Sequence, residues 1–270
     1  MSSPPNPYTD PGLLPVSKPP APVVAIASEN PEWSGWDVLQ IVFLTVVAVA
    51  VFLPVVALAA QRLLYPKVSL LQVVTYPVVT VLGQGLAYLL ILAFMVSIVR
   101  RAPGQHFLHA IRWNWPQNWS AYLLSGVAVS FALQGIARIL PMPKELPMDR
   151  FFRTPSEAWA LSLFSITFAP LLEELFFRGF LYPVLVRRLG VAMAVLTTAA
   201  GFSLIHAPQL GRAWGPVLVI FMVGLALTLT RAITKSVAAS LLMHVAYNGT
   251  LSVLLFIGTD GFRHLERLNQ

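Results

Sequence analysis

The stretch VLQIVFLTVVAVAVFLPVVALAA, residues 38–60, has no charged side chain in 23 consecutive positions. A helix needs about 20 apolar residues to cross a hydrocarbon core about 30 Å thick, so this run is long enough to span a bilayer. The whole chain has the same character, since it is 57% apolar, 11% charged and has a mean hydropathy of +0.72. Such values lie outside the range of soluble globular domains and predict an integral membrane protein.

Further apolar runs follow the first one, and together they predict an all-α, polytopic membrane helical bundle of about seven transmembrane helices, with six to eight allowed. The run 68–99 has 32 uncharged residues, which is more than one upright helix needs. We therefore predict a tilted helix that is broken near Gly83–Gly85. The expected spans are 38–60, 69–99, 119–137, 158–177, 190–206, 214–230 and 236–257.

Three regions are expected along the chain. Residues 1–37 contain nine prolines and no periodic pattern, which predicts a proline-rich disordered tail. The transmembrane helical domain is expected over 38–260, and 261–270 form a short polar tail. Within the domain, the sequence TPSE at 154–157 predicts a helix start with a capping threonine, a proline at the first helical position and a glutamate that completes a capping box.

The charge distribution excludes several classes of function. The net charge is +7, but the basic residues are dispersed in pairs at the ends of apolar segments, where they suit anionic lipid headgroups better than a nucleic acid. They divide almost evenly between the two sides, so they do not give the orientation in the membrane. The chain has no cysteine, which excludes disulfides, thiolate catalysis and cysteine-based zinc sites. The basic pairs are Arg62 and Lys67, Arg100 and Arg101, Arg187 and Arg188, and Arg231 and Lys235.

Two adjacent carboxylates interrupt the apolar pattern in LLEELFFRGF, residues 171–180. Glu173 and Glu174 are the only acidic residues between positions 158 and 259. Glu173 lies 18 residues beyond Pro155, which is about 27 Å along a helix axis and therefore at membrane depth. An ionised carboxylate there costs a few kcal/mol unless it is paired or faces water.

The two glutamates are predicted to differ in role. Glu174 and Arg178 are spaced i to i+4, so they share a helix face and each can neutralise the other. Glu173 is rotated by about 100° from its neighbour and does not share that face. One carboxylate is therefore expected to be paired with the arginine, while the other remains available for chemistry.

Two other predicted spans carry polar groups that could act together with the unpaired carboxylate of Glu173. His206 ends the segment GFSLIHAP, in which Pro208 marks the end of a helix. His244 and Asn248 lie one turn apart on one face of the last span. If these helices adjoin, Glu173, two imidazoles and a carboxamide share one pocket, which is sufficient for hydrolysis by an activated water with donors for a developing oxyanion.

Each polar feature also has a structural interpretation. A single histidine in a membrane helix is often an interhelical hydrogen bond, and an isolated Glu–Arg pair often only joins two helices. Three such features on three spans, with few other ionisable groups among them, favour a functional site over three separate structural contacts.

The three motifs resemble those of a known family. EELFFRG (residues 173–179) is similar to the EExxxRG signature of CPBP intramembrane proteases, which include type II CAAX prenyl endopeptidases and bacteriocin-processing and immunity proteins. FSLIH (202–206) and HVAYN (244–248) look like the FxxxH and HxxxN motifs of that family, in the same order. The resemblance covers roughly residues 155–257. It implies catalytic roles for Glu173, His206, His244 and Asn248, and supporting roles for Glu174 and Arg178.

The resemblance leaves the metal requirement open. The chain has no HExxH motif, which excludes a zincin. A glutamate and two histidines can form an open zinc site or can activate water directly. We favour a site without metal or other cofactor; if a divalent metal such as zinc is bound, its expected ligands are Glu173, His206 and His244.

The function expected from these features is that of an intramembrane endopeptidase, which hydrolyses a peptide bond of a membrane-associated peptide or protein substrate. One alternative is a non-catalytic binding or immunity protein that uses the same pocket. A less favoured one is an ion-coupled transporter, because the polar residues show no two-fold repeat. The expected location is a bacterial inner membrane, with the lipid bilayer as partner and no nucleic acid. The sequence does not identify the substrate or the oligomeric state.

Overall fold

The computed structural model describes residues 31–143, 145–152 and 154–266. The first 30 residues of the predicted tail and the last four residues of the chain lie outside the described residues. Every regular element in the described part is helical, and the predicted all-α bundle is confirmed. The long helices are α1 (Gly35–Leu63), α3 (Pro77–Val99), α5 (Trp119–Ala137), α8 (Tyr182–His206), α9 (Trp214–Thr234) and α10 (Val237–Gly258). The shorter elements are α2 (Leu70–Val73), α4 (Phe107–Ala110), η1 (Asp149–Phe151), α6 (Pro155–Ile166), α7 (Phe168–Glu174) and the π-helix η2 (Leu175–Leu181).

Six helical stretches among the described residues are long and apolar enough to cross a membrane, and one of them, Pro155–His206, has 52 residues. That stretch reverses at Gly190, whose φ of 76° is a left-handed conformation that glycine adopts without steric cost. After the reversal, the ring of Phe202 returns to lie 5.3 Å from that of Phe177. The stretch therefore forms two antiparallel limbs, in agreement with the separate spans predicted on either side of residue 190.

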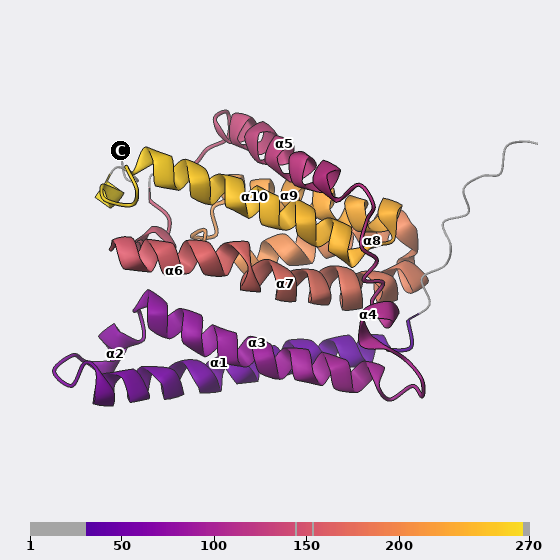
Figure 1. Ribbon diagram of the computed structural model, residues 1–270, viewed down its shortest axis with the longest axis horizontal. Coiled ribbons are helices and arrows are strands. Elements are labelled where there is room, and N and C mark those ends of the chain that lie inside the picture. Colours follow the sequence, from indigo (N-terminus) through magenta and orange to yellow (C-terminus); the bar gives the residue numbers. More distant parts are fainter. Residues whose placement is uncertain (1–30, 144, 153, 267–270) are drawn as a thin grey trace, which may run out of the picture.

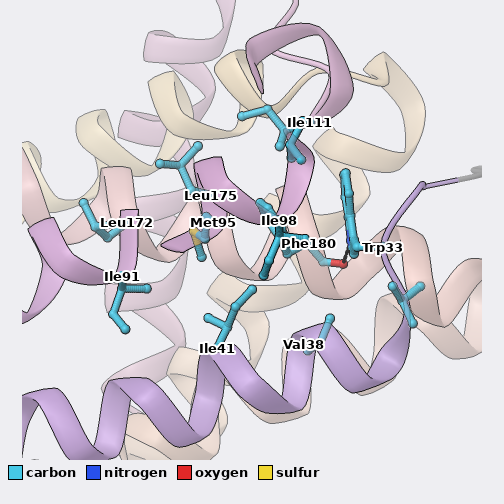
Figure 2. Close-up of a cluster of buried hydrophobic side chains, with 12 residues drawn as sticks. Trp33, Val38, Ile41, Ile91, Met95, Ile98, Ile111, Leu172, Leu175 and Phe180 are labelled. Carbon is cyan, nitrogen blue, oxygen red and sulfur yellow. Dashed lines mark hydrogen bonds between the residues drawn. The ribbon is translucent and has the colours of Figure 1, made fainter. Parts of the chain in front are cut away.

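The helices form two groups that meet along α6 and α7. Helices α1 and α3 lie side by side as a pair, and α5, α8, α9 and α10 lie on the other side of α6 and α7 (Figure 1). A cluster of buried apolar side chains joins the α1–α3 pair to α7 and η2, and Figure 2 shows Ile41, Ile91 and Met95 facing Leu172 and Leu175. A second cluster joins η2 to the opposite group; its buried members are Leu133, Phe177, Phe202, Val223, Leu227, Met243 and Tyr247.

The start of α1 is fixed by contacts with η2 and with the segment that follows α3. Ser34 and Asp37 form a capping box, and Arg101 at the end of α3 pairs with Asp37 at 2.5 Å. Trp33 is buried, stacks on Phe180 of η2 at 4.5 Å between ring centroids and donates its indole N–H to the Phe180 carbonyl (Figure 2). The helix thus begins before the predicted tail boundary at 37, and an indole anchors its start to the π-helix.

The break in the second hydrophobic run is not at the predicted position. Helix α3 is continuous through Gly83–Gly85, and the interruption lies between α2 and α3, directly before Pro77. The residue before a proline is biased away from the α conformation, and Pro77 suits the first helical turn because its missing N–H needs no partner there. Gly83 instead allows close helix packing: a Cβ atom at this position would lie 2.9 Å from the Leu53 Cα of α1.

The predicted capping box at 154–157 is confirmed, because Thr154 and Glu157 bond reciprocally to each other's backbone N–H. The helix that starts there differs from the predicted span 158–177 in two ways. It breaks at Thr167, three residues before Pro170, which has no N–H for the carbonyl of Ile166. It then continues well beyond residue 177 through η2 and the first turns of α8.

The π-helix η2 leaves backbone carbonyls for side chains of other helices. Pro183, just after η2, has no N–H for the carbonyl five residues earlier, which belongs to Arg178. That carbonyl accepts a hydrogen bond from Nε of Arg231 on α9 at 3.1 Å. Together with the Trp33 bond to Phe180, this ties η2 to α9 on one side and to the start of α1 on the other. The segment that directly follows the two glutamates is therefore held from both groups of helices.

Candidate functional site

The two adjacent glutamates lie at the end of α7 and point to different surroundings. Glu174 is completely buried, whereas the Glu173 side chain keeps 15% of its surface accessible. The predicted separation of their faces is therefore observed. It follows from the rotation of about 100° between consecutive helical residues.

The Glu174 carboxylate accepts three hydrogen bonds from two helices. Arg178 Nη1 donates to Oε1 at 2.8 Å, which confirms the predicted i,i+4 pair even though η2 begins between the two residues. From α10, Ser240 Oγ donates to Oε2 at 2.5 Å and His244 Nδ1 lies 2.9 Å from Oε1. A charge at this depth is tolerated only when paired and fully hydrogen-bonded, and these three donors meet that requirement.

The Arg178 guanidinium is as buried as its carboxylate partner, and α9 supplies its remaining acceptors. Nε donates to the Thr228 hydroxyl at 3.3 Å and Nη2 to the Gly224 carbonyl at 3.1 Å. The guanidinium also lies 4.6 Å from the ring centroid of Phe202 on α8, a favourable cation–π contact. One ion pair thus connects α7, α8, α9 and α10.

The His244 imidazole has its orientation set by Glu174. The carboxylate oxygen only accepts, so Nδ1 of His244 carries the proton of the bond between them. In the neutral ring, Nε2 then holds a lone pair, and this nitrogen lies 3.7 Å from Glu173 Oε2. A carboxylate behind one imidazole nitrogen and a reactive position at the other is the arrangement that orients a histidine for proton transfer.

The His206 imidazole is oriented in the same way by its own helix. Its Nδ1 lies 2.7 Å from the Phe202 carbonyl one turn earlier, and because that oxygen only accepts, Nδ1 carries the proton. Its Nε2 faces Glu173 Oε1 at 3.8 Å. As predicted, α8 ends at His206, so the imidazole lies at a helix terminus.

Glu173, His206 and His244 therefore come together from three helices that are distant in the sequence. Each Nε2 is 3.7–3.8 Å from a different oxygen of the Glu173 carboxylate. Such separations exceed a direct hydrogen bond and suit a bridging water. A water in this position donates its two protons to the carboxylate and to one imidazole, and it keeps an oxygen lone pair for attack on a carbonyl carbon.

Asn248, the fourth predicted residue, lies one turn beyond His244 but has a different neighbour. Its Nδ2 donates to the Ser165 carbonyl at 2.7 Å. Ser165 is in the last turn of α6, where backbone carbonyls have no intrahelical donor. One N–H of the carboxamide therefore closes the break between α6 and α7, and its second N–H is the one left for a ligand.

Glu173 also lines an apolar pocket of about 210 Å³ between the α1–α3 pair and the rest of the bundle. Its walls come from α1, α3, α7, η2 and the end of α8, and Glu173 is the one carboxylate among the described lining residues. The polar members are Thr45, Tyr88 and Glu173; the apolar ones are Ile41, Val42, Val46, Ile91, Met95, Leu172, Phe176, Phe177 and Ile205. A mostly apolar pocket with few polar groups is typical of a ligand or substrate site.

The three converging side chains also constitute the predicted alternative zinc ligands. Within the described ranges, no group of three or more histidine, aspartate or glutamate side chains is arranged to hold a metal ion. The metal requirement stays a prediction, and the chemistry proposed below uses the three side chains without a metal.

Sequence reasoning missed several residues that support the site. Ser240 precedes His244 by one turn, so the face that carries His244 and Asn248 already indicated it. Thr228 and the Gly224 carbonyl on α9 gave no signal in the sequence. Arg231 was expected to contact headgroups, but it is 1% exposed and bonded to η2, because the π-helix presents a carbonyl to it.

Comparison with protein-family models gives one match. Residues 155–250 match the model described as type II CAAX prenyl endopeptidase Rce1-like. This part of the chain is similar to the Rce1-like family. The match begins at the capped start of α6 and ends two residues beyond Asn248, so it contains all three motifs and confirms the resemblance. No curated protein and no solved structure matched the chain.

The match to the Rce1-like model implies a protease, that is, a hydrolase of peptide bonds. Together with the six long apolar helical stretches of the described residues, it indicates an integral, multi-pass membrane protein. The α1–α3 pair, which supplies much of the pocket wall, lies outside the matched residues.

Proposed function

We propose that the protein is an intramembrane endopeptidase in which Glu173, with His206 and His244, activates a water molecule. The observation that carries this proposal is the convergence of both imidazole Nε2 atoms on the two oxygens of one carboxylate, at 3.7 and 3.8 Å. The substrate is a peptide bond of a membrane-associated peptide or protein, and the proposed location is a bacterial inner membrane.

Glu173 acts first as the general base. As water attacks the carbonyl carbon, one water proton passes to the carboxylate, a transfer that contributes about 10²- to 10⁴-fold to the rate when the base is well placed. The protonated Glu173 then returns the proton to the amine nitrogen as the C–N bond breaks. The other water O–H donates to the Nε2 of His206 or of His244, which fixes the water oxygen toward the substrate.

The carbonyl oxygen gains negative charge during this attack and requires hydrogen-bond donors. Asn248 supplies its second amide N–H, since the first is used at Ser165. In the form of the enzyme in which a proton from solvent already occupies Nε2, His244 is a second donor, and the Glu174 carboxylate behind the ring stabilises its charge. Glu174 and Arg178 therefore have supporting roles, through the orientation of His244 and the packing of four helices.

The proposal is tested by hydrolysis in a lipid environment. Purified protein in nanodiscs is incubated with a panel of membrane peptides, prenylated and unprenylated, and the products are mapped by mass spectrometry. We expect cleavage at one bond in at least one peptide class. Tight binding of a peptide, without cleavage of any panel member at high enzyme concentration, would instead favour the non-catalytic binding protein.

The absence of a metal from the mechanism gives a separate prediction. Activity should survive exhaustive chelation, because a carboxylate and two imidazoles suffice to polarise water, and the purified protein should contain no stoichiometric zinc. The measurement is metal content by mass spectrometry alongside activity, for the parent protein and for His244→Ala.

A surface variant, His264→Ala, serves as the control, because that imidazole is exposed and pairs with Glu266 away from the pocket. Zinc that is present in the parent and the control but lost from His244→Ala, with activity restored to the chelated parent by added zinc, would show that the mechanism is metal-dependent.

A further inference from the structure

We propose that Tyr88 of α3 is a further catalytic residue, whose phenol O–H donates a hydrogen bond to the carbonyl oxygen of the substrate as that oxygen gains charge. This inference rests on the proposed endopeptidase function. Tyr88 lies outside the residues 155–250 that match the family model, so the match assigns it no role.

The site lacks donors when both imidazoles are neutral. His206 directs its Nδ1 proton to the Phe202 carbonyl, and His244 directs its own to Glu174. Both Nε2 atoms then face the carboxylate as acceptors. The developing oxyanion therefore meets three acceptor groups, and the second N–H of Asn248 is the one donor that the predicted residues offer without a further proton.

Tyr88 supplies the missing donor from the opposite wall of the pocket. It lines the same pocket of about 210 Å³ as Glu173. The third polar lining residue, Thr45, gives its hydroxyl proton to the Ile41 carbonyl of its own helix at 2.7 Å. Among the described residues that line the pocket, Tyr88 is thus the side chain with a hydroxyl proton to offer.

The surroundings of Tyr88 fix its ring and direct its proton. Gln84, one turn earlier on α3, donates its amide N–H to the phenol oxygen at 2.7 Å. An oxygen that accepts one hydrogen bond becomes a better donor in the next, because hydrogen bonds in a chain polarise one another. The ring itself stacks on Phe164 of α6, with centroids 6.0 Å apart and planes 17° apart. The position of the hydroxyl is therefore set before substrate binds, as efficient stabilisation of a transition state requires.

The test is Tyr88→Phe, which removes one oxygen atom and keeps the ring that packs on Phe164. Loss of one oxyanion donor lowers kcat by about 10²- to 10³-fold. We expect a decrease of that size with KM and the thermal unfolding midpoint nearly unchanged. A matched control is Tyr76→Phe, because Tyr76 packs against Tyr65 at the start of α3, away from the pocket. It should keep full activity.

A second measurement separates a catalytic role from a structural one. A substrate peptide whose scissile amide is replaced by a phosphinate presents a tetrahedral, negatively charged oxygen. Its affinity should fall in Tyr88→Phe by the same factor as kcat/KM, while the affinity for the uncleaved amide peptide stays constant. Gln84→Leu should lower kcat/KM and the phosphinate affinity by a smaller factor, because it removes only the hydrogen bond that orients the phenol.

The outcomes distinguish this inference from the proposed function. If the parent cleaves and Glu173→Gln does not, full kcat in Tyr88→Phe overturns the role of Tyr88 alone. A loss confined to KM or to thermal stability overturns it as well, since that result marks a packing role. If the parent cleaves no panel peptide, the endopeptidase proposal fails, and the role of Tyr88 fails with it.

Discussion

We expect Glu173→Gln to lower kcat by about 10³- to 10⁴-fold, near the upper end of what a general base contributes. An amide cannot accept the proton from water, and the imidazole Nε2 atoms at 3.7 and 3.8 Å hold the water but do not replace the carboxylate that lies between them. The substrate KM should change little, because the same pocket walls remain. Single-turnover cleavage followed by mass spectrometry measures this loss.

The same variant should keep its fold, with an unfolding midpoint equal to that of the parent or higher. Replacement of an ionised carboxylate at membrane depth by a neutral amide of the same shape removes a desolvation cost. The control is Glu157→Gln, the same change at the start of α6, where glutamine still completes the capping box with Thr154. Retained activity in Glu173→Gln, or a large loss of stability, would show that Glu173 is not the base.

The second large effect is expected for Glu174→Gln, which should lower the stability of the fold as well as the activity. Glu174→Gln leaves the fully buried Arg178 without a counter-charge, and removal of one partner of a buried ion pair costs about 3–5 kcal/mol. In addition, three donors, from Arg178, Ser240 and His244, would meet an amide that has a single acceptor atom. The unfolding midpoint in detergent and the yield of folded protein should both fall clearly.

A double variant tests the physical cause of this loss. Glu174→Gln combined with Arg178→Met removes the uncompensated charge and should be more stable than Glu174→Gln alone, because the two effects are strongly coupled. Its activity should remain low, since His244 has lost the carboxylate that orients it. Additive destabilisation in the double variant would show that the ion pair is not what holds these helices together.

The features that the sequence predicted are those with a local physical cause. The membrane class follows from the length of uncharged runs, because a hydrocarbon core admits only long apolar helices. The capping box at Thr154, the helix end at His206 and the pairing of Glu174 with Arg178 each depend on residues within four positions of one another. The different surroundings of Glu173 and Glu174 also have a local cause, because consecutive residues of a helix are rotated by about 100°.

The features that sequence reasoning missed depend on contacts between distant segments. Three such features are the π-helix, the burial of Arg231 and the hydrogen bond from Asn248 to Ser165. In the last two, a side chain of one helix donates to a backbone carbonyl of another helix. The burial of Arg231 follows from Pro183, whose missing N–H frees the Arg178 carbonyl without indicating which side chain will bond to it.

The sequence by itself determined that this chain spans a membrane as a helical bundle and that a glutamate, two histidines and an asparagine lie on three of its helices. Only the tertiary structure decided which of these atoms face one another, because that depends on how helices far apart in the sequence pack. It placed Glu173 between two imidazole Nε2 atoms and turned one Asn248 N–H to α6. It also brought Tyr88 into the pocket from a helix that no motif marks, since its place there comes from the packing of α3 against α6 and α7.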